Sequence, residues 1–158
     1  FLKLAELNAL NKTLHFIMVG DGYLKKECLD FIKKKKLKNI TLLGFLNQKQ
    51  LSEYYNIVDL LIMTSDYETW GLSINEAMAA NVPVICSNKC GAHHDMIKKY
   101  KTGFIYNCGE ILDLHSKMNL ILSNRKLLNL IKDNIKKTIS KFTAQKTVDS
   151  IKVILKKK

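Results

Sequence analysis

The sequence predicts a doubly wound α/β protein, in which a parallel sheet is covered by helices on both of its faces. Short, nearly all-apolar runs recur along the chain, as expected for parallel strands that are buried on both sides. Segments with apolar residues at helical spacing separate them, and this alternation indicates a parallel sheet. The length of 158 residues fits one domain, and 47% hydrophobic with 25% charged residues argues against wholesale disorder.

Five strands are expected from the apolar runs and from the small or polar residues that follow most of them. The first run ends at Gly20-Asp21-Gly22, the second at Gly44 and the third at Thr64-Ser65. The fourth run contains the single proline, which the start of a strand tolerates. The predicted strands are Leu14–Val19, Ile40–Leu43, Leu60–Met63, Val82–Cys86 and Gly103–Tyr106.

Helices are expected between these strands and after the last one, where apolar residues return every three or four positions. Thr143 is a plausible cap for the final helix. The predicted helices are Phe1–Leu10, Tyr23–Lys36, Gln48–Asn56, Leu72–Ala80, His93–Lys99, Ile111–Leu122, Arg125–Lys141 and Thr143–Leu155.

The charge balance is strongly basic, with 26 Lys and Arg against 14 Asp and Glu, for a net charge of +12. All the basic residues but Arg125 are lysines, whereas base-reading proteins favour arginine. Lysine excess fits an anionic membrane surface, nucleotide phosphates or solubility. For the runs Lys33–Lys36 and Lys156–Lys158 we favour a solvated helix face and a frayed end.

The sequence also argues against a membrane-spanning or secreted protein and against a zinc-binding protein. No apolar run approaches the roughly 20 residues of a membrane span, and no secretion signal is visible. The cysteines, Cys28, Cys86, Cys90 and Cys108, lack C-x-x-C spacing and complete no zinc pattern with the histidines. We expect reduced thiols, with Cys86 a small core residue.

The segment after the third strand carries the strongest functional signal, because doubly wound sheets bind ligands beyond the carboxyl ends of their strands. Gly71 opens a helix there, and the free amides at a helix start suit an anion such as a diphosphate. Glu68 precedes the helix and Glu76 lies about one turn inside it, so both could accept hydrogen bonds from hydroxyls. The alternative is that Glu68 caps the helix and Glu76 is solvated.

Glu68 and Glu76 are separated by seven residues, and the segment Glu68–Ala79 resembles the E-x7-E motif of retaining GT-B glycosyltransferases, family GT4 (glycosyl transferases group 1). Other blocks resemble the same family in the same order along the chain. These blocks are Phe16–Gly22, Ile40–Leu46, Tyr55–Leu60, Pro83–Ile85 and Thr102–Phe104.

The resemblance implies that residues 1–158 form one Rossmann-like domain, the C-terminal half of a GT-B fold, which binds a UDP- or GDP-sugar donor. No cofactor or metal is implied, and the acceptor would bind to an N-terminal domain. In the family's roles, Glu68 contacts the donor sugar as the catalytic residue and Glu76 accepts the ribose hydroxyls. Diphosphate binding is assigned to the amides of Gly71, Leu72 and Ser73, and base binding to Gly44, Phe45 and Leu46.

The chain departs from the family pattern in several places. The family's first strand, with its Arg and Lys, and the N-terminal domain would precede Phe1, so we expect no transfer by this chain alone. Asn81 stands where Gly is common, and Cys90–Asp95 replaces Gly-Gly-x-x-Glu. Gly91, His93 and His94 are therefore candidates for facing a sugar, the alternative for the histidines being solvent. For Trp70 we favour packing over sugar stacking.

The leading hypothesis is the donor-binding domain of a metal-independent glycosyltransferase that builds a polysaccharide, lipopolysaccharide or other glycoconjugate. One alternative is a nucleotide-sugar epimerase of the same fold. Another is a basic module that docks on an anionic membrane or nucleic acid. We expect a cytoplasmic protein with peripheral contact at the inner membrane face and no nucleic-acid partner.

Overall fold

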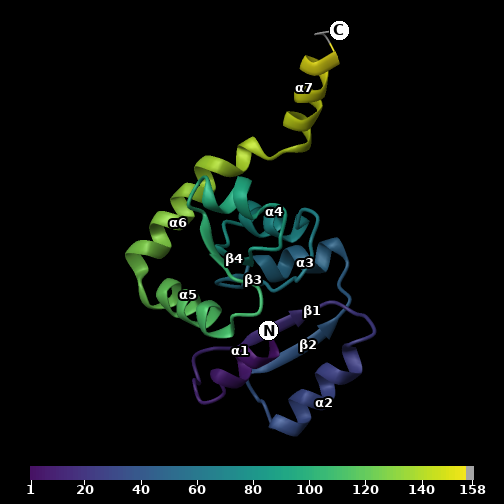
Figure 1. Ribbon diagram of the computed structural model, residues 1–158, viewed down its shortest axis with the longest axis vertical. Coiled ribbons are helices and arrows are strands. Elements are labelled where there is room, and N and C mark those ends of the chain that lie inside the picture. The colour runs from purple at the N-terminus through teal and green to yellow at the C-terminus, as the bar shows by residue number, and fades with distance from the viewer. Residues whose placement is uncertain (156–158) are drawn as a thin grey trace. The chain divides into compact units, whose positions relative to one another are not determined.

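The computed structural model describes residues 1–155, and the lysine run Lys156–Lys158 lies outside the described residues (Figure 1). The chain groups into two compact units, Phe1–Tyr54 and Tyr55–Lys158. Each unit is an α/β structure with its own parallel strands. That the two together form one nucleotide-sugar-binding domain stays a prediction.

The first unit is built on two parallel strands. Its elements are α1 (Leu2–Leu7), β1 (Phe16–Val19), α2 (Lys25–Lys35), β2 (Ile40–Gly44) and α3 (Gln48–Tyr55), whose last residue belongs to the second unit. Phe16 lies opposite Ile40 in the ladder, and both side chains are buried. Helix α1 contacts α2 and buries Leu4 and Ala5. The apolar side chains of neighbouring elements therefore form the core of this unit.

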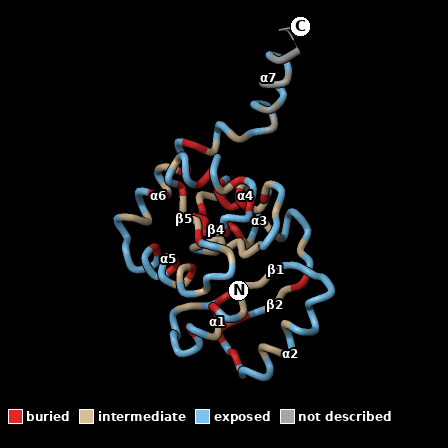
Figure 2. Tube along the Cα trace, viewed as in Figure 1, coloured by how far each residue is buried: buried red, intermediate tan, exposed pale blue. Residues whose placement is uncertain are grey.

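The second unit is built on three parallel strands. Its elements are β3 (Leu61–Met63), α4 (Leu72–Ala79), β4 (Val84–Ser87), the π-helix η1 (His93–Lys98), β5 (Gly103–Tyr106), α5 (Ile111–Ser123), α6 (Arg125–Thr138), the 3-10 helix η2 (Ile139–Lys141) and α7 (Ala144–Leu155). Strand β4 lies between β3 and β5, and all four of its residues are buried (Figure 2). Helices α4 and α5 both contact β4, so the core of the unit surrounds this strand.

Every predicted strand and helix is present, with small shifts at the ends. Helix α1 ends three residues before the predicted Leu10, and the predicted helix Arg125–Lys141 divides into α6 and η2. The proposed cap of α7 is confirmed, because the Lys146 N–H donates to Thr143 Oγ1 at 3.3 Å. Asn81, which stands where the family commonly has Gly, adopts the left-handed conformation with φ +60°, which asparagine tolerates at a helix end.

The prediction of parallel strands is confirmed, and the described strands are divided between two hydrogen-bonded sets. Among the described residues the hydrogen-bonded strands form two sets, β1-β2 and β3-β4-β5. All the pairings are parallel, as the apolar runs indicated. In the Rossmann strand order 3-2-1-4-5-6, strands 2 and 3 pair with each other and 4, 5 and 6 form a set. The observed pairings are those two sets.

The charged and cysteine-bearing segments behave largely as expected. Lys33–Lys36 is exposed at the end of α2, where Lys35 pairs with Glu6 at 2.7 Å, so a solvated helix face is confirmed for this run. Cys86 is fully buried, and burial raises the pKa of its thiol to about 12, as fits a core residue. In the part of the chain that the structure describes, no helix has the length and apolar character of a membrane span.

Candidate functional site

The loops that follow β3, β4 and β5 meet at the carboxyl edge of this sheet and are hydrogen-bonded to one another. The hydroxyl of Ser87, at the end of β4, donates to the carbonyl of Ser65 in the loop after β3. The amide of Asn88 donates to the Tyr106 carbonyl at 2.9 Å, and its side-chain oxygen accepts from the Cys108 amide at 3.0 Å. These bonds hold the three loops together at the place where a doubly wound sheet binds its ligand.

The loop before α4 and the loop after β4 are joined by a short ladder of backbone hydrogen bonds. The Glu68 amide donates to Lys89 at 3.2 Å, and the Gly91 amide donates to Glu68 at 2.8 Å. A Cβ on Gly91 would lie 1.9 Å from the carbonyl oxygen of Thr69, so this position excludes any side chain. Glycine is therefore what allows the two loops to come into contact.

Gly71 immediately precedes helix α4 as its N-cap, and its φ of +99° lies in the left-handed region that favours glycine. The first bond of the helix runs from the Ile74 amide to the Gly71 carbonyl at 2.8 Å. The amides of Leu72 and Ser73 precede it and, as at any helix start, have no acceptor within the helix. With the partial positive charge of the helix start, they can bind an anion.

Glu68 is half-buried in the loop before α4. Its Oε1 accepts the backbone N–H of Trp70 at 3.2 Å, which lies ahead of the helix. Among the described residues no side-chain hydrogen bond caps α4, and Glu68 accepts from an amide ahead of the helix, so the alternative interpretation of Glu68 as a helix cap is wrong. The bond instead fixes the turn that leads into the helix and holds the carboxylate beside its first residues.

Glu76 is also half-buried, one turn into α4. Its Oε2 lies 3.1 Å from the hydroxyl of Tyr55, the last residue of α3. The alternative interpretation of Glu76 as a freely solvated helix residue is therefore wrong. Sequence reasoning overlooked Tyr55, although the Tyr55–Leu60 block contained it, because nothing in the local sequence indicates which side chain its hydroxyl contacts.

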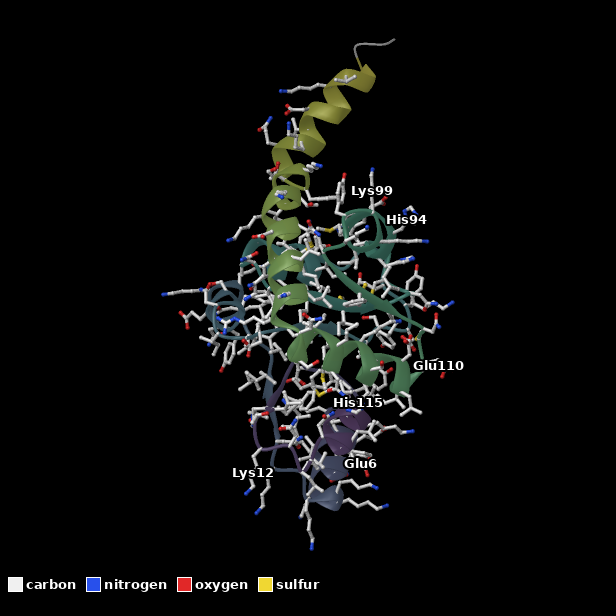
Figure 3. All side chains as sticks on the ribbon, turned by 90° about the vertical axis from the view of Figure 1, so that its left-hand side faces the viewer. Glu6, Lys12, His94, Lys99, Glu110 and His115 are labelled. Carbon is white, nitrogen blue, oxygen red and sulfur yellow. The ribbon has the colours of Figure 1, made fainter. Side chains whose placement is uncertain are left out.

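The aromatic and histidine side chains around this edge have distinct environments. The indole Nε1 of Trp70 donates to Asn75 Oδ1 at 2.9 Å, which agrees with a packing role. The carbonyl of Cys90 accepts a 2.6 Å hydrogen bond from His93 Nδ1, which fixes the proton on that nitrogen. His94 projects outward from η1 (Figure 3). Its Nδ1 lies 3.7 Å from Asp95 Oδ1. Its exposure fits the solvent alternative, whereas His93 is half-buried.

The predicted base-binding residues belong to the first unit, at the carboxyl edge of β1 and β2. The Gly20 amide donates to the Gly44 carbonyl at 2.8 Å, and Gly44 has φ +75°. Phe45 is 76% exposed and Leu46 is half-buried. The ring of Phe45 is thus exposed to solvent in the segment that follows β2.

The described fold and site define a Rossmann-like α/β protein in which a helix start preceded by glycine lies beside two half-buried carboxylates. The model of the family called glycosyl transferases group 1 matches residues 1–138. The chain belongs to this family. Within the described residues, no group of three or more His, Cys, Asp or Glu side chains is arranged to hold a metal ion.

Individual relatives agree with this family. The chain is 27% identical over 140 residues to an uncharacterized glycosyltransferase of Methanocaldococcus jannaschii, covering 89% of this chain and 40% of that protein. It is 32% identical over 116 residues to sulfoquinovosyl transferase SQD2 of Arabidopsis thaliana, covering 72% of this chain and 22% of that protein. The chain thus spans less than half the length of either relative.

The fold matches that of a solved structure. HepE of Anabaena, in a crystal structure with UDP-glucose, superposes with a TM-score of 0.83 at 23% identity, covering 99% of this chain and 44% of that one. The prediction of a Rossmann-like C-terminal half of a GT-B fold is therefore confirmed.

Proposed function

We propose that this chain is the nucleotide-sugar-binding domain of a longer, retaining, metal-independent glycosyltransferase. The observation that carries the proposal is the arrangement of Glu68 and Glu76 around the start of α4, at the carboxyl edge of β3-β4-β5. Family membership supports the same conclusion, because the matched residues 1–138 include the segment Glu68–Ala79 that resembles the family's E-x7-E motif.

The diphosphate of the donor would bind at the start of α4. The amides of Gly71, Leu72 and Ser73 supply donors, and the helix dipole supplies partial positive charge. When the sugar is transferred, negative charge grows on the departing diphosphate. Fixed N–H donors stabilise that charge without a metal ion, because they are already oriented before the reaction begins.

The two carboxylates would bind the sugars on either side of this diphosphate. Glu76 would accept hydrogen bonds from the ribose hydroxyls, and Glu68 would contact the transferred sugar as the catalytic residue. A carboxylate suits both tasks, because its two oxygens accept bonds from neighbouring hydroxyls and such charge-assisted bonds are strong. The bond from Trp70 keeps the Glu68 carboxylate in place before the donor arrives.

The remaining predicted contacts are assigned to the base and the transferred sugar. Gly44, Phe45 and Leu46 would line the base, and the exposed ring of Phe45 supports this role because a base can stack on it. Gly91 and His93 belong to the loop joined to Glu68, so we propose that they face the transferred sugar, with exposed His94 a less supported candidate.

A UDP- or GDP-sugar is the proposed substrate, and UDP-glucose in the HepE crystal structure supports the first of these. An N-terminal domain of the same protein would bind the acceptor, since the curated relatives are more than twice as long as the part that this chain matches. The product would be a polysaccharide, lipopolysaccharide or other glycoconjugate. We place the protein in the cytoplasm, and its lysine excess supports peripheral contact with an anionic inner membrane face.

Substitution of Glu76 tests the proposal most directly. In the full-length protein, Glu76→Gln keeps the shape of the side chain and removes its charge. We expect kcat/KM for the nucleotide sugar to fall at least about tenfold, because a charge-assisted hydrogen bond contributes roughly 1.5–3 kcal/mol. The measurement is release of nucleoside diphosphate and sugar transfer with UDP- and GDP-sugars.

The matched control is Glu27→Gln, which makes the same change at an exposed position on α2. Its kcat/KM should equal that of the unsubstituted protein. Equal activity of the Glu76→Gln variant and this control would rule out the proposed role of Glu76 in donor binding.

A further inference from the structure

Tyr55 contacts the proposed donor site from a different helix. It is the last residue of α3 and is 7% exposed. Its hydroxyl oxygen lies 3.1 Å from Glu76 Oε2 and 3.4 Å from the carbonyl oxygen of Ser73. The hydroxyl has one proton, and the carboxylate is both the closer and the charged acceptor. Tyr55 therefore donates chiefly to Glu76.

The Tyr55 hydroxyl keeps its proton wherever the protein is assayed. Burial raises its pKa to about 12, and the neighbouring Glu76 carboxylate contributes to the same shift. A tyrosinate beside a carboxylate would be doubly unfavourable, because both groups would be negative and one is buried. Tyr55 is thus a permanent hydrogen-bond donor to Glu76.

The two acceptors of this hydroxyl are three residues apart, so they lie on one face of α4. One belongs to the residue whose amide is proposed to bind the diphosphate, and the other is the carboxylate proposed to bind the ribose. A glutamate side chain on a helix surface samples several rotamers. A bond from a buried tyrosine on another helix selects among them.

We propose that Tyr55 is a positioning residue for donor binding, which holds the Glu76 carboxylate in the orientation that accepts the ribose hydroxyls. This inference rests on the proposed function of Glu76. Tyr55 touches no part of the donor in this role and acts through Glu76 alone.

The test is Tyr55→Phe in the full-length protein, which removes the hydroxyl and keeps the ring. UDP and GDP are titrated by calorimetry, and the nucleotide that the unsubstituted protein binds is used throughout. We expect its Kd to rise about ten- to twentyfold, which lies at the lower end of the range for loss of a hydrogen bond to a charged group. KM for the nucleotide sugar should rise by a similar factor with kcat nearly unchanged, since the ribose is bound equally before and during transfer.

The 2′,3′-dideoxy form of the same nucleotide separates positioning from packing. It lacks the hydroxyls that Glu76 would bind, so Tyr55→Phe and the unsubstituted protein should bind it equally. The matched control is Tyr106→Phe, which removes the hydroxyl of another buried tyrosine in the same unit, close to cysteine thiols. That variant should bind both nucleotides as the unsubstituted protein does.

Other outcomes overturn the inference in distinguishable ways. Unchanged nucleotide binding by Tyr55→Phe, while Glu76→Gln weakens it, overturns the role of Tyr55 and leaves the proposed function in place. Equal losses for the ribose and dideoxy forms mean that Tyr55 serves only the packing of α3, which also overturns its role. Full binding by Glu76→Gln, or no binding of UDP and GDP by the unsubstituted protein, overturns the proposed function together with the inference.

Discussion

The carboxyl edges of the two units are held in different ways. At the edge of β3-β4-β5, backbone bonds join the loop of Glu68 to the loop of Gly91, and the Ser87 hydroxyl adds a second link between the same two loops. Asn88 joins the loop after β5 to them. At the edge of β1-β2, one backbone bond joins Gly20 to Gly44, and the neighbouring Asp21–Lys25 ion pair is exposed.

The difference indicates which edge is shaped before a ligand arrives. Loops that are bonded to each other need little further ordering when a ligand binds, so less conformational entropy is lost. The edge of β3-β4-β5, which carries both Glu68 and Glu76, has loops that are bonded to each other in this way. The edge of β1-β2 presents the exposed Phe45 next to Gly44, whose backbone is in the left-handed region, and one backbone bond links its two strands there. A stacked base tolerates such freedom better than reacting groups do.

The largest expected effect comes from Gly91→Ala, which breaks the junction between the two bonded loops. The added Cβ would lie 1.9 Å from the Thr69 carbonyl oxygen, and both groups are backbone or attached directly to it. We expect a loss of about 3 kcal/mol or more in the free energy of unfolding. Thermal unfolding should show a melting temperature lower by roughly 10 °C.

The same substitution at the other edge is the control for this comparison. A Cβ on Gly22 would meet no atom within 4 Å. Gly22→Ala should therefore change the melting temperature by no more than about 2 °C, in line with substitutions at open surface positions. Similar melting temperatures for the two variants would show that the junction at Gly91 is not rigid.

Local sequence patterns were sufficient to locate the carboxyl edge of β3-β4-β5, but they did not predict the hydrogen bonds and contacts that join its loops. The strand, Gly71 and the helix with Glu68 and Glu76 are adjacent in the chain, so spacing alone placed them. The contact between Gly91 and Thr69 joins segments 22 positions apart, and nothing in either segment names its partner. Strand pairing was only partly predictable for the same reason, since apolar runs predict strands but not which strands share hydrogen bonds.

Substitution of Gly44 should have an intermediate effect on stability, because a side chain there would strain the backbone without overlapping a neighbouring atom. A Cβ there would have open space, with the nearest atom, Lys25 Nζ, at 3.7 Å, but φ is +75°. Gly44→Ala should lower the free energy of unfolding by about 1–2 kcal/mol, the cost of a left-handed residue with a side chain. The urea midpoint would fall with an unchanged slope.

Gly44→Asn serves as its control, because asparagine adopts the left-handed conformation more readily than alanine does. The asparagine variant should unfold at a higher urea concentration than the alanine variant. The reverse order would mean that backbone strain is not what selects glycine at this position.

The smallest expected effect is the loss of stability at low pH that comes from two surface carboxylates, Asp21 in the first unit and Asp113 in the second. Asp21 accepts from Lys25 and the Gly22 amide, and these bonds lower its pKa. Asp113 accepts from Lys117 and from the amide of Asn107, which lower its pKa in the same way. A lowered pKa means that the stabilisation is present above the ordinary value near 4 and is lost as the pH falls through the folded-state value.

Carboxyl carbon shifts followed by NMR between about pH 6 and 2 would measure both titrations. Both midpoints should lie below the ordinary aspartate value. For Asp113, the Asn107 amide should shift with the same midpoint, because their bond spans six residues and joins α5 to the loop after β5. An ordinary midpoint for either group would show that its bonds do not persist in solution.

The residues of the candidate site that lie close together in the chain could be predicted from the sequence, whereas those that are distant in the chain could not. Glu68, Glu76 and the amides between them come from one continuous stretch, so a motif could name them. Tyr55 contributes through a bond across 21 positions, and a tyrosine hydroxyl has no preferred sequence distance from its acceptor. The two alternatives for the glutamates failed for a related reason, since their partners, Trp70 and Tyr55, depend on side-chain geometry that spacing does not contain.

The burial of Cys86 and Cys90 also decides where a chemical label can be attached. Both thiols are fully buried with raised pKa values, mainly because of that burial, so little reactive thiolate forms at neutral pH. Cys28 and Cys108 are partly accessible, and Cys108 lies in the loop after β5, at the bonded edge. A maleimide fluorophore would therefore react there without removal of the buried cysteines, and with Cys28 replaced by serine the dye would sit beside the proposed donor site as a reporter of occupancy.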